Sequence, residues 1–598
     1  MSNPLVDRRH LDLLLHDMFD AGALCRYPRF AEHSREVFDA TIDVALQIAE
    51  QKFAPHNRKS DLNEPRMVDG KVELIPEIED ALNAFNEAGF MAIYADAEDG
   101  GMQMPFLITS ACDALFAAAN ASTPAYPLLA RAAANLLAVY GSAEQKRLYM
   151  RPIVEGRYYG TMCLSEPQAG SSLADIKTTA TPQDDGSYRI TGSKMWISAG
   201  DHEMGENIIH LVLAKIAGAP PGVKGISLFI VPRFRVEADG SRGVRNDVLL
   251  AGLNHKMGQR GSVNTFLKFG ENDDCVGHLV GQPHQGLAYM FHMMNEERIG
   301  VGMGAVQQGH AGYLYALQYA RERRQGRHPD QRDPTAPMLP IIEHADVRRM
   351  LLQQRCYVEG AQALGLYAAA LVDHAHEGEQ PLRGESGQLL ELLTPVVKAW
   401  SSDYCLKANE LAVQVLGGYG YTREYPVEQN YRDNRINPIH EGTNGIQALD
   451  LLGRKAMQDG GAALNLLFQR ISETCRGAIE DEALAAHAAA LTDATRLLGA
   501  TTRKAGADMA GGAARAVLAN AHWYMQLFGH VCIGWMWLWQ TLAARRKAAN
   551  DASLADFAAG KLAACRFFFA TELPQIQHWA NLVQTVDRSA LDASPESF

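Results

Sequence analysis

The sequence predicts a mainly α-helical fold with a central β-barrel-like or sandwich module and an appended C-terminal helical domain. Helical apolar spacing dominates residues 1–160, as in "DATIDVALQIAEQKF". Short β-rich runs separated by turn residues then occupy residues 161–280. Helical patterns return over residues 281–455, and an alanine- and leucine-rich helical stretch fills residues 456–598. We expect these four ranges to be four domains.

The strand and helix assignments depend on a few segments. "YRITGSKMWIS", "IIHLVLAKI", "GISLFIVPRF" and "NTFLKFG" are rich in β-branched and aromatic residues, which predicts strands. Residues 298–324 and 395–415 sustain helical spacing. Residues 524–543 come near the ~20-residue length of a membrane span. Because Gln526, His530 and Gln540 interrupt that run, we expect a buried helix there.

Composition restricts the class of protein. The chain has 598 residues and a formal net charge of −13, which argues against a nucleic-acid-binding surface. Its nine cysteines are scattered singly, without a CxxC pair, so we expect a reducing compartment, no disulfide framework and no metal site. The N-terminal residues mix charges among apolar side chains and lack a signal-peptide core, which indicates a cytoplasmic location.

The stretch "NPIHEGTNGIQALDLLGRK" raises the main functional question. Glu441 stands just before a helical pattern that Thr443 or Asn444 could cap. Acidic residues are common near helix N-termini, because the exposed N–H groups there carry partial positive charge. The alternative is that Glu441 is a catalytic base. Proximity to the helix start should lower its pKa and burial should raise it, so the sequence leaves both interpretations open.

Three turn-rich segments in the middle range are candidates for ligand contact. "EPQAGSS" offers backbone N–H groups and hydroxyls, "KMWISAG" places Trp196 near a strand end, and "LNHKMGQRGS" is basic. Each has a structural alternative. The first could be only a loop, and a tryptophan such as Trp196 is more often part of a core than a stacking platform.

In this order and spacing, these segments resemble the acyl-CoA dehydrogenase family over roughly residues 40–455. The most specific matches are "CLSEPQAGSS", "GSKMWIS", "MGQRGS", "QVLGGYGY", "YPVEQNYRDNRI" and "HEGTNGIQ". The N-terminal segment and the tail after residue 456 resemble the larger, C-terminally extended subgroup. That subgroup includes methylthiopropionyl-CoA dehydrogenases and other long-form acyl-CoA dehydrogenases.

The resemblance implies an FAD enzyme that oxidises a saturated acyl-CoA to the trans-2-enoyl-CoA. Glu441 would take the α-proton while the β-hydride passes to flavin N5, and its own backbone N–H would help to bind the enolate oxygen. Such a base typically contributes ~10²–10⁴-fold to the rate. The resemblance also implies an electron-transferring flavoprotein as the electron acceptor. It implies a homodimer as well, with the tail covering the surface through which shorter relatives form tetramers.

The resemblance assigns roles to individual residues. Those expected to contact FAD from the same subunit are Met162, Leu164, Ser165, Ser171, Trp196, Ser198 and Thr443. Those expected to reach the FAD of a neighbouring subunit are Arg323, Gln414 and Gly418. Those expected to bind the acyl-CoA are Ser171, Asn295, Arg298, Glu441 and Gly442.

The chain departs from the family pattern in three places. "RRQG" after Arg323 lacks the usual threonine and phenylalanine, which leaves the FAD contacts there open. Gly445 stands where many relatives have glutamine. His440 replaces a tyrosine that often precedes the catalytic glutamate, and this side chain would lie beside the thioester, where it bears on acyl-chain specificity.

Other interpretations remain. Glu297 occupies the position where some relatives carry the base; its structural alternative is an acid in the first turn of a long helix. An acyl-CoA oxidase would use the same base and flavin with O₂. A DNA-binding flavoprotein of this fold would need a basic tail, but residues 456–598 hold 12 Lys and Arg against 13 Asp and Glu. Membrane docking through Trp535, Trp537 and Trp539 is a further alternative, although we expect no membrane contact.

Overall fold

The computed structural model describes residues 5–598, including every side chain except those of residues 291–295. The chain divides into two compact units, which are described separately. The helical unit comprises the segment up to Arg35, Phe106–Ala114 and Arg298–Phe598. The barrel unit comprises Glu36–Pro105 and Leu115–Glu297. The mainly helical fold with a central barrel-like module, predicted above, is confirmed.

The barrel unit contains a closed ring of strands. β5, β12, β7, β6 and β4 pair in succession, and β4 pairs back onto β5 to complete the ring. β3 extends the sheet beside β6, and β11 and β10 extend it beside β5. The bounds are β3 (Tyr158–Cys163), β4 (Thr179–Pro182), β5 (Tyr188–Ser198), β6 (Asn207–Ile216), β7 (Ile226–Pro232), β10 (Val248–Leu253), β11 (Asn264–Phe269) and β12 (Val276–Leu279).

Burial patterns along the strands explain this arrangement. Every residue of β7 is buried, as is most of β6, which suits central strands made of continuous apolar runs. β11 alternates between half-buried and buried positions, as expected for a strand with one covered face. The four segments predicted as strands therefore form β5, β6, β7 and β11.

Helices and two small hairpins complete the barrel unit. The hairpins are β1 (Arg66–Val68) with β2 (Lys71–Glu73), and β8 (Phe234–Val236) with β9 (Arg242–Arg245). The helices are α2 (Arg35–Ile48), α3 (Ala54–Leu62), α4 (Pro76–Glu87), the end of α5 (Phe106–Ala119, which begins in the helical unit), α6 (Ala125–Tyr140), α7 (Ala143–Gln145) and α8 (Arg151–Val154). The rings of Phe53, Phe85, Phe90 and Phe116 pack together among them, which supplies an apolar core. Residues 36–157 are thus mostly helical, as predicted.

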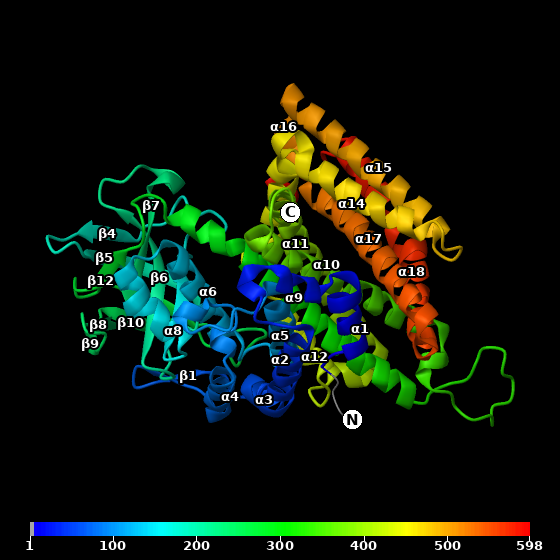
Figure 1. The fold of residues 1–598 in the computed structure, drawn as a ribbon, viewed down its shortest axis with the longest axis horizontal. Coiled ribbons are helices and arrows are strands. Elements are labelled where there is room, and N and C mark those ends of the chain that lie inside the picture. Colours follow the sequence, from blue (N-terminus) through cyan, green and yellow to red (C-terminus); the bar gives the residue numbers. More distant parts are fainter. Residues whose placement is uncertain (1–4) are drawn as a thin grey trace. The chain divides into compact units, whose positions relative to one another are not determined.

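The helical unit is built around three long helices and a bundle that follows them. Its first part contains α1 (Arg8–Asp12), α9 (Gly286–Glu322, which begins in the barrel unit), α10 (Ala345–Glu377), α11 (Leu382–Leu416), α12 (Val427–Asn434) and α13 (Asn444–Asp450). Its C-terminal part contains α14 (Ala462–Ala478), α15 (Ala485–Asp508), α16 (Ala514–Leu518), α17 (Ala521–Asn550), α18 (Ala555–Phe567), α19 (Ile576–Gln584) and α20 (Ser589–Asp592). α14, α15 and α17 run alongside one another (Figure 1).

The segment that resembles a membrane span lies in α17 and is buried. Tyr524, Trp535 and Trp537 are almost fully buried, and Gln526, His530 and Gln540 are buried beside them with hydrogen-bond partners. None of the described helices is long and apolar enough to cross a membrane. The prediction of a buried helix is confirmed.

Candidate functional site

Glu441 lies in a tight loop between α12 and α13. Its φ is +51° and that of Gly442 is +79°, so both residues adopt the left-handed conformation, which is strained for a glutamate. α13 begins at Asn444, so Glu441 precedes the helix and lies outside its first turn. Thr443 occupies the N-cap position, but its hydroxyl donates to the carbonyl of Pro438 at 3.2 Å. The predicted cap position at Thr443 is therefore confirmed, but its side chain makes no capping bond to α13.

The loop exposes two functional groups of Glu441. Neither its carboxylate nor its backbone N–H has a hydrogen-bond partner within the described part of the chain. Its carbonyl and that of Gly442 accept bonds from Gln447 Nε2 at 3.4 Å and 3.1 Å. The φ of +79° at Gly442, with a Cβ there only 2.4 Å from the same Nε2, favours glycine at this position. One residue thus presents an open base and an open donor side by side.

Two cations act on the Glu441 carboxyl. Burial raises its pKa above the ordinary value, while the charges of Arg298 and Lys398 oppose that shift. His440 does not add a third charge, because burial and Lys398 lower its pKa to about 3. Its Nε2 lies 3.0 Å from Asn437 Oδ1. Burial therefore outweighs the two cations, and the net effect is a raised pKa for Glu441, a balance that the sequence left open.

α9 supplies three acyl-CoA or base candidates. Arg298 is buried on this helix, and a Cβ on Gly442 would lie 3.9 Å from its Nη2. Glu297 lies well inside α9, which begins at Gly286, so the first-turn interpretation of this residue is wrong. The side chain of Asn295 is outside the described residues. Sequence reasoning missed Glu296, whose pKa burial raises to about 7, although a bond from Asn135 opposes the shift.

In the barrel unit, the loop after β3 is held by a buried ion pair. Lys194 Nζ lies 3.0 Å from Glu166 Oε1 and donates to the carbonyl of Leu164 at 3.0 Å. Glu166 also accepts from the backbone N–H groups of Lys177 and Thr178 and from the Thr178 hydroxyl. Sequence reasoning missed this pair, because the two residues are 28 positions apart.

The ion pair positions the predicted FAD contacts of this loop. Met162 is a half-buried residue of β3, and Leu164 and Ser165 follow that strand directly. The carbonyl of Ser165 accepts from the N–H of Met195, which ties the loop to β5. Ser171 is exposed farther along the loop. The loop interpretation and the binding interpretation of "EPQAGSS" are both compatible with this geometry.

Trp196 is the most unusual residue of β5. Its φ is +66° and its side chain is 63% exposed, so the interpretation of Trp196 as a core residue is wrong. Ser198 follows on the same strand, and its Oγ accepts from Asn264 Nδ2 at 3.1 Å. The strand therefore presents an indole to solvent beside an ordered hydroxyl, which is an arrangement suited to a planar ligand.

The residues predicted to reach a neighbouring subunit gather at one place in the helical unit. Arg323 follows the end of α9, Gln414 lies in the last turn of α11, and Gly418 comes just after it. All three are exposed, and the Arg323 guanidinium lies 5.5 Å from the ring centre of Tyr419. A Cβ on Gly418 would meet no atom within 4 Å, so its backbone is open to approach.

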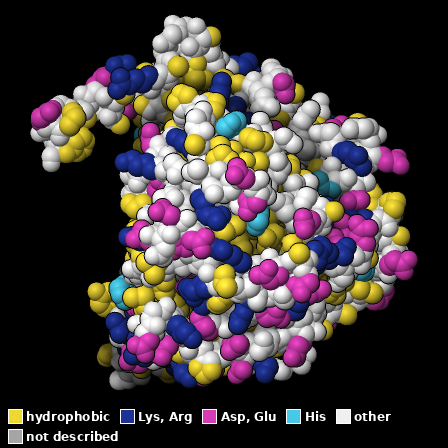
Figure 2. All heavy atoms as spheres, turned by 90° about the vertical axis from the view of Figure 1, so that its left-hand side faces the viewer, with side chains coloured by type: hydrophobic (Ala, Val, Ile, Leu, Met, Phe, Trp, Pro, Cys, Tyr) yellow, Lys and Arg dark blue, Asp and Glu magenta, His cyan; other side chains and the backbone are white. Residues whose placement is uncertain are grey.

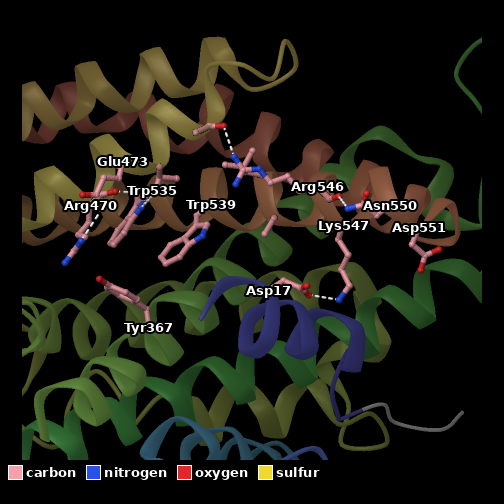
Figure 3. Close-up of a pocket in the computed structure, with 14 residues that line it drawn as sticks. Asp17, Tyr367, Arg470, Glu473, Trp535, Trp539, Arg546, Lys547, Asn550 and Asp551 are labelled. Atoms are coloured by element: carbon pink, nitrogen blue, oxygen red, sulfur yellow. Dashed lines mark hydrogen bonds and ion pairs between the residues drawn. The ribbon is translucent and has the colours of Figure 1, made fainter. Parts of the chain in front are cut away.

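A cavity of about 620 Å³ lies elsewhere in the helical unit, against α17 (Figure 3). Trp535, Trp539 and Tyr367 form its aromatic wall, and Lys547 is paired with Asp17 at its edge. It contains none of the predicted site residues. Because Trp535 and Trp537 are buried and only Trp539 is half-buried, these indoles do not form an exposed membrane-docking cluster.

Charged side chains of both signs are mixed on the side of the molecule seen in Figure 2. Lys and Arg side chains are interspersed there with Asp and Glu side chains, and no large patch of one sign is visible. With a formal net charge of −13, the absence of a nucleic-acid partner stays a prediction.

Comparison with known protein families gives four successive matches. They are "Acyl-CoA dehydrogenase, N-terminal domain" over residues 38–157, the middle domain over 161–269 and the C-terminal domain over 284–456. A fourth, "Acetyl-CoA dehydrogenase C-terminal like", covers residues 467–594. Together they span nearly the whole chain.

Individual relatives match over almost their full length. The chain is 37% identical to 3-methylmercaptopropionyl-CoA dehydrogenase of Ruegeria pomeroyi, over 91% of this chain and 92% of that protein. It is 36% identical to the broad-specificity linear acyl-CoA dehydrogenase FadE5 of Mycobacterium tuberculosis, over 94% and 95%. The crystal structure of Caenorhabditis elegans ACDH-11 in complex with C11-CoA shares the fold, with a TM-score of 0.78, 18% identity and coverage of 99% and 97%.

Proposed function

Because the chain belongs to the acyl-CoA dehydrogenase family, we propose that Glu441 is the base that removes the α-proton of its acyl-CoA substrate. The chain is an FAD-dependent oxidoreductase that acts on the CH–CH bond of acyl-CoA thioesters. In the proposed reaction a saturated acyl-CoA becomes the trans-2-enoyl-CoA. The Glu441 carboxylate gains the α-proton, and a C=C bond forms as the β-hydride leaves.

The observation that supports this role is the pair of open groups on Glu441. A thioester α-proton is weakly acidic, so its removal needs both a positioned base and a donor for the developing enolate oxygen. Glu441 offers a carboxylate without a partner and a backbone N–H without an acceptor, counted over the described residues. Losing such a donor typically costs ~10²–10³-fold in rate. A single residue, Glu441, would supply both this donor and the base.

The chain's own residues fit FAD at two places. In the barrel unit, the exposed indole of Trp196 and the hydroxyl of Ser198 suit a planar, polar-edged ligand. In the helical unit, Arg323, Gln414 and the open backbone of Gly418 suit an anionic nucleotide portion. The remaining residues that we propose to hold FAD are Met162, Leu164, Ser165, Ser171 and Thr443. When bound, FAD supplies the acceptor for the β-hydride at its N5 atom.

Acyl-CoA contacts are proposed for a second group of residues. Arg298 is buried near Gly442, and Glu441 and Gly442 present their backbone in the same loop. Ser171 and Asn295 complete the proposed set. The neutral imidazole of His440 stands where a tyrosine often precedes the base, and we propose that it contributes to acyl-chain selection.

The decisive experiment compares two substitutions in the FAD-loaded enzyme. Glu441→Gln keeps size and polarity but removes the base, so anaerobic flavin reduction by an acyl-CoA should slow by at least ~10²-fold with little change in substrate affinity. Glu297→Gln should slow it far less. Near-normal reduction in Glu441→Gln together with a dead Glu297→Gln would transfer the role of base to α9.

We propose an electron-transferring flavoprotein as the electron acceptor, as the family resemblance implies. Turnover with such a protein or an artificial dye should be fast, and turnover with O₂ alone should be slow, because bound product excludes water and gas from the site. Stoichiometric peroxide formed at the full rate would instead identify an acyl-CoA oxidase.

We also propose a homodimer, in which Arg323, Gln414 and Gly418 contact the FAD of the partner. Light scattering of the FAD-loaded protein should then give the mass of two chains. A monomer that retains FAD would contradict the shared site. A tetramer would contradict the proposal that the C-terminal helices cover the second interface.

A further inference from the structure

A buried lysine on α11 contacts the first residue of α13, close to the Glu441 loop. The Lys398 side chain is 0% exposed, and its Nζ donates to Asn444 Oδ1 at 2.9 Å. Asn444 comes three positions after Glu441 and is the first residue of α13. A fully buried ammonium group is costly unless it is hydrogen-bonded and faces negative charge, so its presence here calls for a specific role.

Asn444 joins the start of α13 to α11 through several further bonds. Its Nδ2 donates to Asp403 Oδ1 at 2.8 Å, to Ser402 Oγ at 3.0 Å and to the carbonyl of Ala399 at 3.2 Å. All of these partners lie on one turn of α11, next to Lys398. This turn of α11 therefore restrains the end of the loop that precedes α13.

The same turn of α11 is held from its other side by α17, a helix of the C-terminal part. Trp400 Nε1 donates to His530 Nδ1 at 3.1 Å, and the Tyr404 hydroxyl donates to Gln526 Oε1 at 2.7 Å. The two helices approach so closely that a Cβ on Gly529 would lie 2.2 Å from Trp400 Cδ1. α17 thus fixes the turn that carries Lys398, Ser402 and Asp403.

We propose that Lys398 is a positioning residue for the Glu441 base, acting through Asn444 and through its charge, and that α17 holds it in place. This inference rests on the proposed role of Glu441. Lys398 restrains the loop by its bond to Asn444, and its positive charge favours the ionised carboxylate. The C-terminal helices therefore act on the reaction indirectly, through α11.

The charges around this pair define what a pH experiment will report. Arg298 on α9 and Lys398 on α11 act on Glu441, and His440 is uncharged. Asp403 and Glu441 face Lys398, while His522 on α17 and Lys407 act on Asp403. Burial lowers the pKa of Lys398 to about 8, so it is mostly charged at neutral pH. Without the charge of Lys398, Arg298 is the remaining cation that lowers the pKa of Glu441 against the effect of burial.

The test uses two substitutions that separate the bond from the charge. Lys398→Met removes both and leaves Asn444 bonded to α11, so the protein should fold. Lys398→Gln keeps a donor for Asn444 and removes only the charge. In stopped-flow reduction of the FAD-loaded enzyme, the rate should rise with pH through the Glu441 pKa. Both variants should move that rise upward by about one pH unit or more. Only Lys398→Met should also lower the plateau rate, by ~10-fold or more.

Lys455→Met is the matched control. Lys455 is also buried, its pKa is likewise lowered to about 8 by burial, and its Nζ donates to the carbonyl of Glu391 at 2.7 Å. It has no bond to Asn444, so this variant should keep the wild-type pH profile even if its melting temperature falls. An unchanged profile in Lys398→Met, or an equal shift in Lys455→Met, overturns the proposal.

Gln526→Leu tests the contribution of α17. It removes the acceptor of the Tyr404 hydroxyl and should lower the plateau rate in the same direction as Lys398→Met but by less. A rate unchanged in Gln526→Leu refutes the role of α17. Glu441→Gln, measured in parallel, distinguishes a failure of the proposed base from a failure of the proposed positioning role. If it still reduces flavin normally, the proposed base is wrong; if it is inactive while Lys398→Met is normal, only the positioning role is wrong.

Discussion

Glu166 in the barrel unit and Glu441 in the helical unit each have a lysine near their carboxyl, yet their environments are opposite. Glu166 accepts bonds from two backbone N–H groups, a hydroxyl and Lys194, and these partners hold its pKa at about 2 despite the opposing effect of burial. The Glu441 carboxylate has no hydrogen-bond partner within the described chain, and burial raises its pKa.

The comparison shows that a cation within hydrogen-bond distance, supported by several further donors, keeps a buried carboxylate ionised, whereas cations that make no hydrogen bond to it do not overcome burial. A carboxylate with several donors is stable as an ion and poor at accepting a proton. A carboxylate that faces cations at a distance but has no donor keeps its affinity for a proton, which a base requires. Glu166 is therefore a structural ion, and Glu441 has the properties of a base.

The largest effect on stability is expected from breaking the structural pair. Glu166→Gln leaves Lys194 charged and buried without its carboxylate, which should lower the free energy of unfolding by ~3–5 kcal/mol. Urea unfolding monitored by circular dichroism measures this. The double variant Glu166→Gln/Lys194→Met should recover part of the loss, because no charge remains buried. A loss below ~1 kcal/mol in Glu166→Gln would contradict the structural role.

The pH dependence of stability should have opposite signs at the two glutamates. The folded-state pKa of Glu166 is below the ordinary value, so its stabilisation is present at neutral pH and is lost as pH falls from about 4.5 toward about 2. The pKa of Glu441 is raised, so its ionisation destabilises the fold at neutral pH, and stability is regained as pH falls through that raised pKa.

Unfolding free energies of wild type, Glu166→Gln and Glu441→Gln measured across acidic to neutral pH test this contrast. The difference between wild type and Glu166→Gln should shrink as the solution becomes acidic. The stability of wild type relative to Glu441→Gln should instead rise as the solution becomes acidic. Equal slopes for both variants would remove the distinction drawn here.

The fold and the family could be predicted from the sequence because they depend on local patterns. The apolar runs of β6 and β7 and the helical spacing of α9 and α11 are continuous in the chain. Motifs such as "HEGTNGIQ" are equally local, so Glu441 and its loop could be identified as candidates. The domain limits at residues 160, 280 and 455 and the roles of the site residues stay predictions.

Features that depend on distant residues or on backbone conformation could not be predicted. The Glu166–Lys194 pair and the link from Lys398 through Asn444 join residues that are 28 and 46 positions apart. Exposure of Trp196 follows from a positive φ within a strand, which its residue type disfavours. Glu297 lies inside α9 because the helix begins twelve residues before Arg298, where the apolar spacing starts to indicate a helix.

An intermediate effect is expected from changing the backbone of the base loop. Gly442→Ala forces a side chain into the left-handed region, at a cost of ~1–2 kcal/mol, and places a Cβ 2.4 Å from Gln447 Nε2. The loop should shift, and flavin reduction should slow by ~10–10²-fold. Gly445→Ala is the control, because a Cβ there meets no atom within 4 Å and the position lies in α13. That variant should retain the wild-type rate.

The smallest effect on stability is expected at Trp196, and it separates a ligand platform from a packing residue. Because the side chain is 63% exposed, Trp196→Ala should change the unfolding free energy by no more than ~0.5 kcal/mol. Trp and Ala would have the same positive φ at position 196, so the backbone strain is equal in the two proteins and cancels in the comparison. Trp537→Ala is the contrasting variant, since Trp537 is fully buried and its loss should cost ~3–5 kcal/mol.

Titration of the apoprotein with FAD gives the second reading of Trp196→Ala. Loss of an aromatic stacking surface should weaken FAD binding by ~1 kcal/mol, a roughly fivefold increase in Kd, with no fall in melting temperature of the apoprotein. A drop in stability close to that of Trp537→Ala would mean that the indole packs against the protein after all. Unchanged FAD affinity with unchanged stability would leave the strained conformation of Trp196 without a ligand to explain it, and the FAD contact proposed for β5 would be wrong.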